Sequence, residues 1–388
     1  MVKSVHATGR EVRVGEVLVI ERAGLQALLD AVRAAGYLLI GPTVRNEAVV
    51  YDEVSTVADL PAGWTDEQAG GSYRLTRRDD ETLFGYTLSP QSWKRFLFPP
   101  LVTMWQAHRD GTTFVIDRPR AEVPRYAFLG VRACELAAIA IQDRVFLEGP
   151  YVDPGYKARR EQALFIAVNC GKACGTCFCT SMQTGPQATT GFDLALTEVL
   201  EGGRHYFTVE VGTERGAALL RTVPATPAEP GEKAAAEGVV AATAAHMGRE
   251  LDTTHLKEIL TANYEHPRWD AVATRCLTCG NCTMVCPTCF CMTVEDVSDL
   301  AGQEATRTRH WDSCFNVDYS YIHGGSIRLS PKSRYRQWLM HKLATWHDQF
   351  GTSGCVGCGR CITWCPVGID ITEEAGAVRR TARPLPKE

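Results

Sequence analysis

The sequence predicts an α/β N-terminal domain with a mixed sheet, followed by a mainly helical, cysteine-rich domain. Three observations support this fold class. Strand-like and helix-like segments alternate up to about residue 222, the composition then becomes rich in Ala, Pro and Glu, and two cysteine runs follow among helical patterns. Alternating elements are typical of α/β domains. We expect an α/β domain at 1–222, an Ala/Pro-rich connector at 223–248 and the helical domain at 249–388.

The N-terminal elements follow from hydrophobic periodicity. Short β-branched and apolar runs predict strands at 16–24, 38–44, 47–54, 114–117, 126–131, 163–169 and 205–212. Apolar residues at helical spacing predict helices at 25–36, 135–146 and 214–221. The stretch 222–246 (TVPATPAEPGEKAAAEGVVAATAAH) is predicted to be part linker and part helix.

Helical patterns surround the cysteine runs of the C-terminal domain. They lie at 251–264, at 294–302 (VEDVSDLAG) and at 333–350 (SRYRQWLMHKLATWHDQF). The runs are much farther apart than a compact domain of this kind requires. We therefore expect an insertion between the two cysteine loops, in a helical domain rather than in a small hairpin-rich one.

The two cysteine runs share the pattern C-x2-C-x2-C-x3-C-P. This is the pattern of two-[4Fe–4S] ferredoxins, in which the fourth cysteine of each run ligates the other cluster. The expected ligand sets are Cys276, Cys279, Cys282 and Cys365 for one cluster, and Cys355, Cys358, Cys361 and Cys286 for the other. Zinc is the alternative, although a zinc site needs only four ligands and usually shows two separated C-x2-C pairs.

Eight further cysteines lie outside these runs. Cys134 and Cys170 follow predicted strands, and Cys174, Cys177 and Cys179 lie in the loop after the second of them. Ligands of open α/β sheets bind at the carboxyl ends of strands, where such loops meet. We expect a third [4Fe–4S] cluster held by Cys134, Cys170, Cys177 and Cys179, with Cys174 as a spare thiol. Buried structural thiols and a zinc site are the alternatives.

A short repeat links the two cysteine-rich regions. CGTCFC at 174–179 matches CPTCFC at 286–291, which suggests that both loops wrap clusters, with Phe178 and Phe290 as shields. For Cys289, Cys291 and Cys314 we favour a role in lining the ferredoxin clusters. A further metal site is the alternative, with His310 as the nearby imidazole.

Composition and missing motifs narrow the function. Near-equal numbers of basic (41) and acidic (45) residues give no sign of nucleic acid or an anionic membrane as partner. No apolar stretch approaches the roughly 18 residues of a membrane span, and the N-terminus does not resemble a signal peptide. Sixteen cysteines then indicate metal-binding thiols in a cytoplasmic protein. No Rossmann or P-loop motif for a nucleotide is present, and we expect no catalytic residues.

Two basic-aromatic stretches are candidates for contact with a partner. One carries Arg334, Arg336, His341 and Lys342 on a predicted helix, and its other possible roles are hydrogen bonding to reduced clusters or a plain solvated face. The other, QSWKRFLFPP, contains Lys94 and fits a sheet edge equally well.

The chain resembles the iron–sulfur beta subunit of soluble NAD(P)-linked nickel–iron hydrogenases (sulfhydrogenases) and, more distantly, the iron–sulfur subunit of anaerobic sulfite reductase. The resemblance rests on GVRACELAAIAIQDRVF, NCGKACGTCFCTSMQTGP, RCLTCGNCTMVCPTCFC with WDSCF, SYIHGGSIRLSPKSRYRQWLMHKLATW and SGCVGCGRCITWCPVGIDI. Cys174 departs from the family's loop, so which loop cysteines bind iron stays open.

The resemblance implies an electron-transfer subunit of a cytoplasmic hydrogenase complex. It would relay electrons and dock on a flavin subunit that binds NAD(P), beside hydrogenase small and large subunits. Whether the chain is itself an enzyme stays open. The alternatives are an iron–sulfur subunit of a sulfite or polysulfide reductase, an N-terminal domain that itself reduces sulfur compounds, and a structural or redox-sensing protein.

Overall fold

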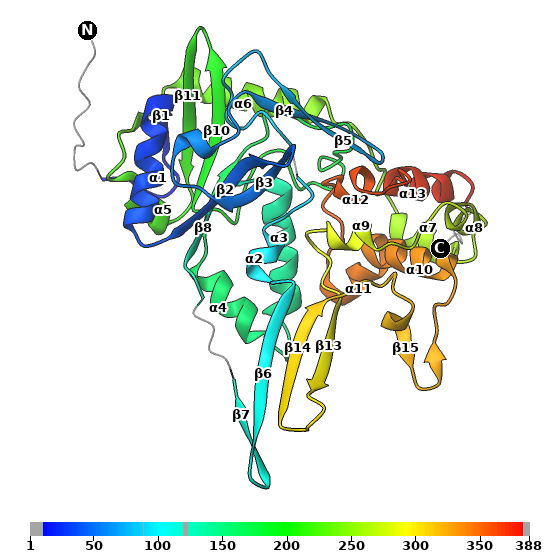
Figure 1. Cartoon of the computed structure of the whole chain (residues 1–388). Coiled ribbons are helices and arrows are strands. Elements are labelled where there is room, and N and C mark those ends of the chain that lie inside the picture. The colour runs from blue at the N-terminus through cyan, green and yellow to red at the C-terminus, as the bar shows by residue number, and fades with distance from the viewer. Residues whose placement is uncertain (1–10, 88, 119–122, 383–388) are drawn as a thin grey trace.

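The computed structural model describes residues 11–87, 89–118 and 123–382. An N-terminal part built on a large sheet lies beside a C-terminal part built mostly of helices, and a group of long strands projects away from both (Figure 1). The predicted fold class, an α/β region followed by a partly helical cysteine-rich region, is confirmed.

The N-terminal sheet contains eight strands among the described residues. Their bounds are β1 Val17–Glu21, β2 Leu38–Arg45, β3 Ala48–Glu53, β8 Tyr126–Val131, β9 Leu164–Val168, β10 Leu194–Glu201, β11 Arg204–Val211 and β12 Thr226–Pro227. The order is β12-β1-β11-β10-β9-β8-β2-β3. β8 runs parallel to β2 and β9, and β9 runs parallel to β10, whereas the other neighbours are antiparallel. The sheet is therefore mixed, as predicted.

Helices cover both faces of this sheet. They are α1 Leu25–Ala34, α2 Lys94–Leu97, α3 Ala133–Phe146, α4 Pro154–Gln162, α5 Glu214–Leu220 and α6 Pro230–Ala245, the last within the predicted connector. α1 and α5 share a core with Leu18 and Ile20 of β1, while Val19 between them packs toward α6. Successive strand residues point to opposite faces. α3 and α4 share a second core with Phe128 and Phe165. Every residue of β9 is buried, as expected for a parallel strand covered on both faces.

The C-terminal helices pack around large aromatic side chains. They are α7 Leu256–Ala262, α8 Arg268–Ala273, α9 Asn281–Met284, α10 Pro331–Met340, α11 Trp346–Phe350, α12 Arg360–Thr363 and α13 Ile371–Arg380, with short 3-10 turns at Arg22–Gly24, Val57–Asp59 and Asp318–Ser320 elsewhere. Trp269 and Trp338 belong to their common core. A π-helical turn, His341–Thr345, joins α10 to α11.

The predicted helix at 294–302 is wrong. This segment belongs to strand β13 (Met292–Ser298), which pairs with β14 (Glu304–Trp311). β14 in turn pairs with β6 (Leu101–Asp110), and β6 with β7 (Thr113–Asp117), so that the sheet has the order β13-β14-β6-β7. Backbone pairing with strands almost 200 residues away outweighs the local helical pattern. The insertion between the cysteine runs also contains the hairpin of β15 (Tyr321–Ile322) and β16 (Gly325–Ser326).

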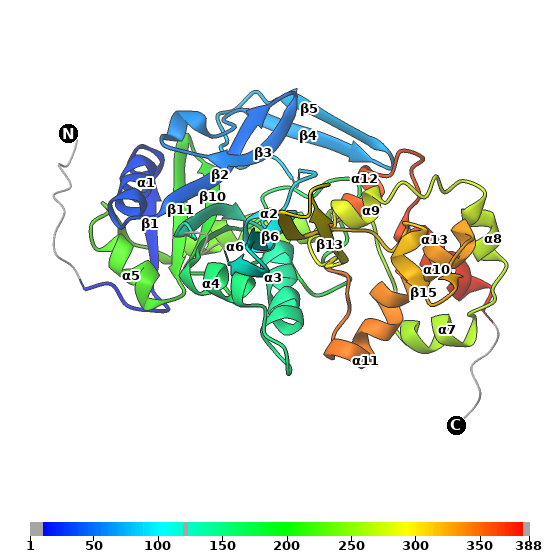
Figure 2. The same cartoon turned by 60° about the horizontal axis from the view of Figure 1, so that its bottom comes forward.

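A further hairpin joins the two parts of the chain. β4 (Trp64–Ala69) and β5 (Ser72–Arg77) extend from the N-terminal part toward α12 (Figure 2). At its turn, the Gly71 N–H donates to the Ile362 carbonyl at 3.1 Å. Tyr73 stacks on Trp364 with ring centroids 5.3 Å apart. The second cysteine run is therefore held against the N-terminal part.

Candidate iron–sulfur centres

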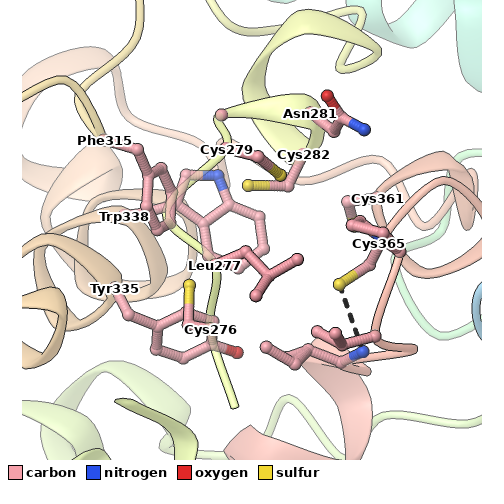
Figure 3. Close-up of a pocket in the computed structure, with 14 residues that line it drawn as sticks. Cys276, Leu277, Cys279, Asn281, Cys282, Phe315, Tyr335, Trp338, Cys361 and Cys365 are labelled. Atoms are coloured by element: carbon pink, nitrogen blue, oxygen red, sulfur yellow. Dashed lines mark hydrogen bonds between the residues drawn. The ribbon is translucent and has the colours of Figure 1, made fainter. Parts of the chain in front are cut away.

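The first cysteine run forms an apolar cavity with the last cysteine of the second run. Figure 3 shows Cys276, Cys279, Cys282 and Cys365 around this space. The other lining residues are Leu277, Gly280, Asn281, Phe315, Tyr335, Trp338, Cys361, Pro366, Val367 and Ile369. The chain reaches this position because α9 begins after Gly280, whose φ of 76° is in the left-handed region that glycine favours. The structure thus brings together the four cysteines that the crossed pairing requires.

The donor set of this cavity fits an iron–sulfur cluster. Backbone N–H groups donate to two of the thiols, from Thr278 to Cys276 at 3.4 Å and from Ile369 to Cys365 at 3.3 Å. Such donors favour the thiolate, which is the form that binds metal. In the described parts of the chain, no three His, Cys, Asp or Glu side chains converge as a single metal ion would require. The four thiols instead lie around the wall of one cavity.

The second run gathers around Cys286. Burial raises the pKa of Cys361, and the neighbouring Cys355, Cys358 and Cys286 thiols raise it further. Like thiols shift one another in this way only when they are close. The Gly357 N–H donates to Cys355 Sγ at 3.4 Å, which repeats the contact seen at Cys276. The structure therefore also brings together the expected members of the second ligand set.

The N-terminal cysteines meet at the carboxyl edge of the parallel strands. Cys134 lies in the first turn of α3, which follows β8, and Cys170 follows β9, the neighbour of β8. Burial raises the pKa of Cys179 to about 12, with contributions from Cys170 and then Cys358. Burial also raises the pKa of Cys134, again with Cys179 and Cys358 as neighbours. This group therefore lies close to the second run.

Cys174, the expected spare thiol, belongs to the same group. Its Sγ lies 3.0 Å from Sγ of Cys177. This hydrogen bond and one from Thr176 lower the pKa of Cys174 to about 6. Both Cys174 and Cys177 are thus placed to supply a fourth thiolate beside Cys134, Cys170 and Cys179.

The repeated hexapeptide has the same local structure in both places. Cys174 Sγ lies 3.2 Å from Thr176 Oγ1, and Cys286 Sγ lies 3.2 Å from Thr288 Oγ1. Both threonines are fully buried. Phe178, predicted to shield a cluster, is fully buried as well.

Comparison with known proteins gives the family. Residues 275–369 match a family model described as a 4Fe–4S dicluster domain. The sulfhydrogenase 2 subunit beta of Pyrococcus furiosus is 31% identical over 304 residues, which cover 77% of this chain and 86% of that protein. The chain belongs to the sulfhydrogenase beta-subunit family. The resemblance drawn from the sequence is therefore confirmed, and the dicluster domain implies two [4Fe–4S] clusters.

Two further comparisons complete this description of the sulfhydrogenase beta-subunit homologue. No solved structure matches the chain. Within residues 11–87, 89–118 and 123–382, no helix combines the length and the apolar content that crossing a membrane requires.

The remaining cysteines of this beta-subunit homologue lie beside the ferredoxin-like runs. The Cys289 thiol hydrogen-bonds to Cys286. Cys291 accepts hydrogen bonds from Cys314 and Tyr319, which lower its pKa to about 6. Tyr319 was not expected, because nothing in its local sequence marks it. His310 lies 3.8 Å from Glu295, a contact made along the projecting sheet.

Charged residues that the sequence did not single out lie buried between the cysteine groups. The guanidinium of Arg360 pairs with Glu135, and both side chains are 1% exposed. Arg132, also 1% exposed, donates to four backbone carbonyls and lies near Cys170. Arg360 lies within the second run, where the first run has Asn281, but a single sequence does not reveal that such a residue is buried.

The second run packs directly on the loop that carries the N-terminal cysteines. The Phe178 N–H donates to the Gly357 carbonyl at 2.9 Å, and Thr184 Oγ1 donates to the Val356 carbonyl at 2.6 Å. Thr176 Oγ1 lies 2.8 Å from Thr363 Oγ1. The three cysteine groups therefore follow one another in the order N-terminal group, second run, first run.

Replacing Gly359 with alanine should weaken this contact. Gly359 has φ 76°, and a Cβ there would overlap the Thr176 carbonyl oxygen and lie 2.6 Å from Thr176 Oγ1. We expect a loss of about 2 kcal/mol or more in unfolding free energy, from backbone strain and forced displacement, measured by denaturant unfolding of the iron-loaded chain. The control is Gly302→Ala, which has a similar φ of 62° but no atom near its Cβ. Equal losses in both variants would show that the contact adds nothing to stability.

Proposed function

We propose that this chain is the electron-transfer subunit of an NAD(P)-linked nickel–iron hydrogenase complex in the cytoplasm. The observation that carries the proposal is the row of three cysteine groups, in which the N-terminal group and the first run lie on either side of the second run. A row of redox centres suits relay of electrons, and no catalytic constellation accompanies it among the described residues. The domain boundaries proposed from the sequence, 1–222, 223–248 and 249–388, assign one end of the row to each domain.

The proposed ligands are the crossed sets for the ferredoxin-like clusters and an N-terminal set for a third cluster. The crossed sets are Cys276, Cys279, Cys282 and Cys365, and Cys355, Cys358, Cys361 and Cys286. The third set is Cys134, Cys170, Cys177 and Cys179. A cluster supplies one-electron transfer, and the chain's own residues hold it, exclude water and set the charge around it.

Iron counting tests the third cluster. Four irons per cluster predict about 12 irons in the anaerobically purified chain and about 8 in a Cys179→Ala variant. The EPR signals of the ferredoxin-like pair should persist in the variant. Cys314→Ala is the control, because that cysteine lies outside the proposed sets. A count near 8 in the unmodified chain would overturn the third cluster and leave the ferredoxin-like pair intact.

We propose that the projecting sheet docks other hydrogenase subunits, among them the flavin subunit. All five residues of β7 are exposed, and the exposed apolar side chains of the sheet include Phe114, Ile116 and Val297. Apolar side chains gathered on a surface commonly mark a binding site for another protein. A Phe114→Ser/Ile116→Ser variant should keep its iron but copurify with less flavin subunit. Unchanged copurification would rule out these residues as a docking site.

Reduction of sulfur compounds is the second candidate, for this chain or for a sulfite or polysulfide reductase that contains it. The specific observation in its favour is the contact between the Cys174 and Cys177 thiols, with the lowered pKa of Cys174. Both residues are buried, at 4% and 7% exposure, which favours electron relay instead. Assays of a Cys177→Ala complex decide between them. Loss of sulfur reduction with intact hydrogen-to-NAD(P) transfer would favour the second candidate.

A further inference from the structure

A lysine lies buried between the two loops that carry Cys286 and Cys355. Lys342, in the π-helical turn between α10 and α11, is only 3% exposed. Its Nζ donates to Thr288 Oγ1 at 2.5 Å and to the Gly354 carbonyl at 3.0 Å. These acceptors belong to the two cysteine loops that meet at the second cluster. π-Helical turns are rare and frequently occur at functional sites.

This buried ammonium group has thiols as neighbours. Among the described residues, no ion pair joins Lys342 to a carboxylate. Burial by itself lowers the pKa of Lys342, but the Cys286 and Cys289 thiols outweigh that effect and raise it overall. A charge that is buried this completely needs an opposite charge nearby. The anionic cluster that Cys286 and Cys355 are proposed to hold would supply it.

A second lysine lies at the same loop. Lys94 in α2 is 4% exposed, and its Nζ donates to the Cys289 carbonyl at 3.2 Å. Its ammonium also lies over the Trp311 ring, 3.8 Å from the centroid, a favourable cation–π arrangement. Burial lowers the pKa of Lys94, so its charge is less firmly held than that of Lys342.

The first cavity is built differently. None of its lining residues is a lysine or an arginine. The cation nearest to it that bears on its thiols is Arg334, whose guanidinium donates to the Phe315 carbonyl at 2.6 Å and has only a minor effect on Cys276. The two ferredoxin-like sites therefore differ in the positive charge placed beside them.

We propose that Lys342, assisted by Lys94, raises the reduction potential of the cluster that Cys355, Cys358, Cys361 and Cys286 would hold. Reduction adds one negative charge to a cluster. A positive charge a few ångströms away in a low-dielectric interior stabilises the reduced form more than the oxidised one. Electrons would then reside preferentially on the second cluster, between the other two cysteine groups. The proposal rests on the proposed function in one respect, that this cluster is bound.

The test is an EPR-monitored redox titration of the full, iron-loaded chain. The signal of the second cluster is first identified as the one missing from a Cys361→Ala variant. Lys342→Gln keeps a hydrogen-bond donor but removes the charge, and Lys342→Arg keeps the charge. At a fixed potential, we expect the ratio of reduced to oxidised second cluster to fall at least about tenfold in Lys342→Gln. For a one-electron couple this corresponds to about 59 mV. Lys342→Arg should stay near the unmodified value.

Two controls make the outcome decisive. Lys157→Met removes an exposed charge of α4 that pairs with Glu161, and it should leave every cluster potential unchanged. The first cluster should not shift in any Lys342 variant. An unshifted second cluster in a Lys342→Gln chain with full iron content overturns the charge effect but not the proposed function.

If Lys342→Gln loses iron, Lys94→Met provides the same measurement. A lower potential of the second cluster in that variant supports the proposal, and an unchanged potential overturns it. Absence of the second cluster from the unmodified chain would instead contradict the proposed function.

Discussion

Replacing Cys365 with alanine should remove the same cluster as replacing Cys276 with alanine. Both residues line the cavity of the first run, although Cys365 belongs to the second. Each variant should lose about four irons per chain and the same set of EPR signals, because a [4Fe–4S] cluster requires its full set of thiolates. Anaerobic iron and sulfide analysis with EPR measures both effects. This is the largest effect that we expect from a single substitution.

The matched comparison is made within the second set. Cys286→Ala should resemble Cys361→Ala and differ from Cys365→Ala. If each cluster instead took all its ligands from one run, Cys365→Ala would resemble Cys361→Ala. That spectrum would contradict the crossed pairing. Cys314→Ala, outside both sets, should keep the iron content of the unmodified chain.

The parts of the fold that are encoded locally could be predicted from the sequence. The cysteine runs are local patterns, because three closely spaced thiols must wrap one corner of a cluster. Strands such as β9 are visible as short apolar runs, and helices such as α1 show a clear amphipathic period. The positions of Cys134 and Cys170 at one sheet edge also followed, because both come directly after predicted parallel strands.

What could not be predicted depends on residues far apart in the chain. The segment 294–302 has a helical pattern, yet β13 pairs with β14, which in turn pairs with β6 from the other half of the chain. Lys94 and Lys342 look like surface residues of basic-aromatic stretches, but both are buried beside the loop that follows Cys286. Burial of a polar side chain is decided by how distant elements pack, so periodicity does not reveal it.

The buried pair of Glu135 and Arg360 is the clearest case of such long-range structure, and its loss should strongly destabilise the protein. Glu135 lies in the first turn of α3 and Arg360 in α12, so the pair joins the N-terminal part to the second cysteine run. The Glu135 carboxylate also accepts from Trp93 Nε1 at 2.9 Å and from the Tyr51 hydroxyl at 3.2 Å. Glu135→Gln leaves the Arg360 charge buried without its partner. We expect a loss of about 3–5 kcal/mol in unfolding free energy.

Denaturant unfolding of the iron-loaded chain measures this loss, and two further variants show its origin. Asp52→Asn breaks the exposed pair with Arg45, and it should cost less than about 1 kcal/mol because solvent screens that pair. Glu135→Gln combined with Arg360→Met should be more stable than the sum of the two single losses predicts, since the double variant no longer buries an unpaired charge. Additive losses would mean that the pair contributes through packing alone. A coupled loss accompanied by altered EPR of the second cluster would show that the charge pair also fixes the cysteine run against the N-terminal part, because Arg360 lies beside Cys358.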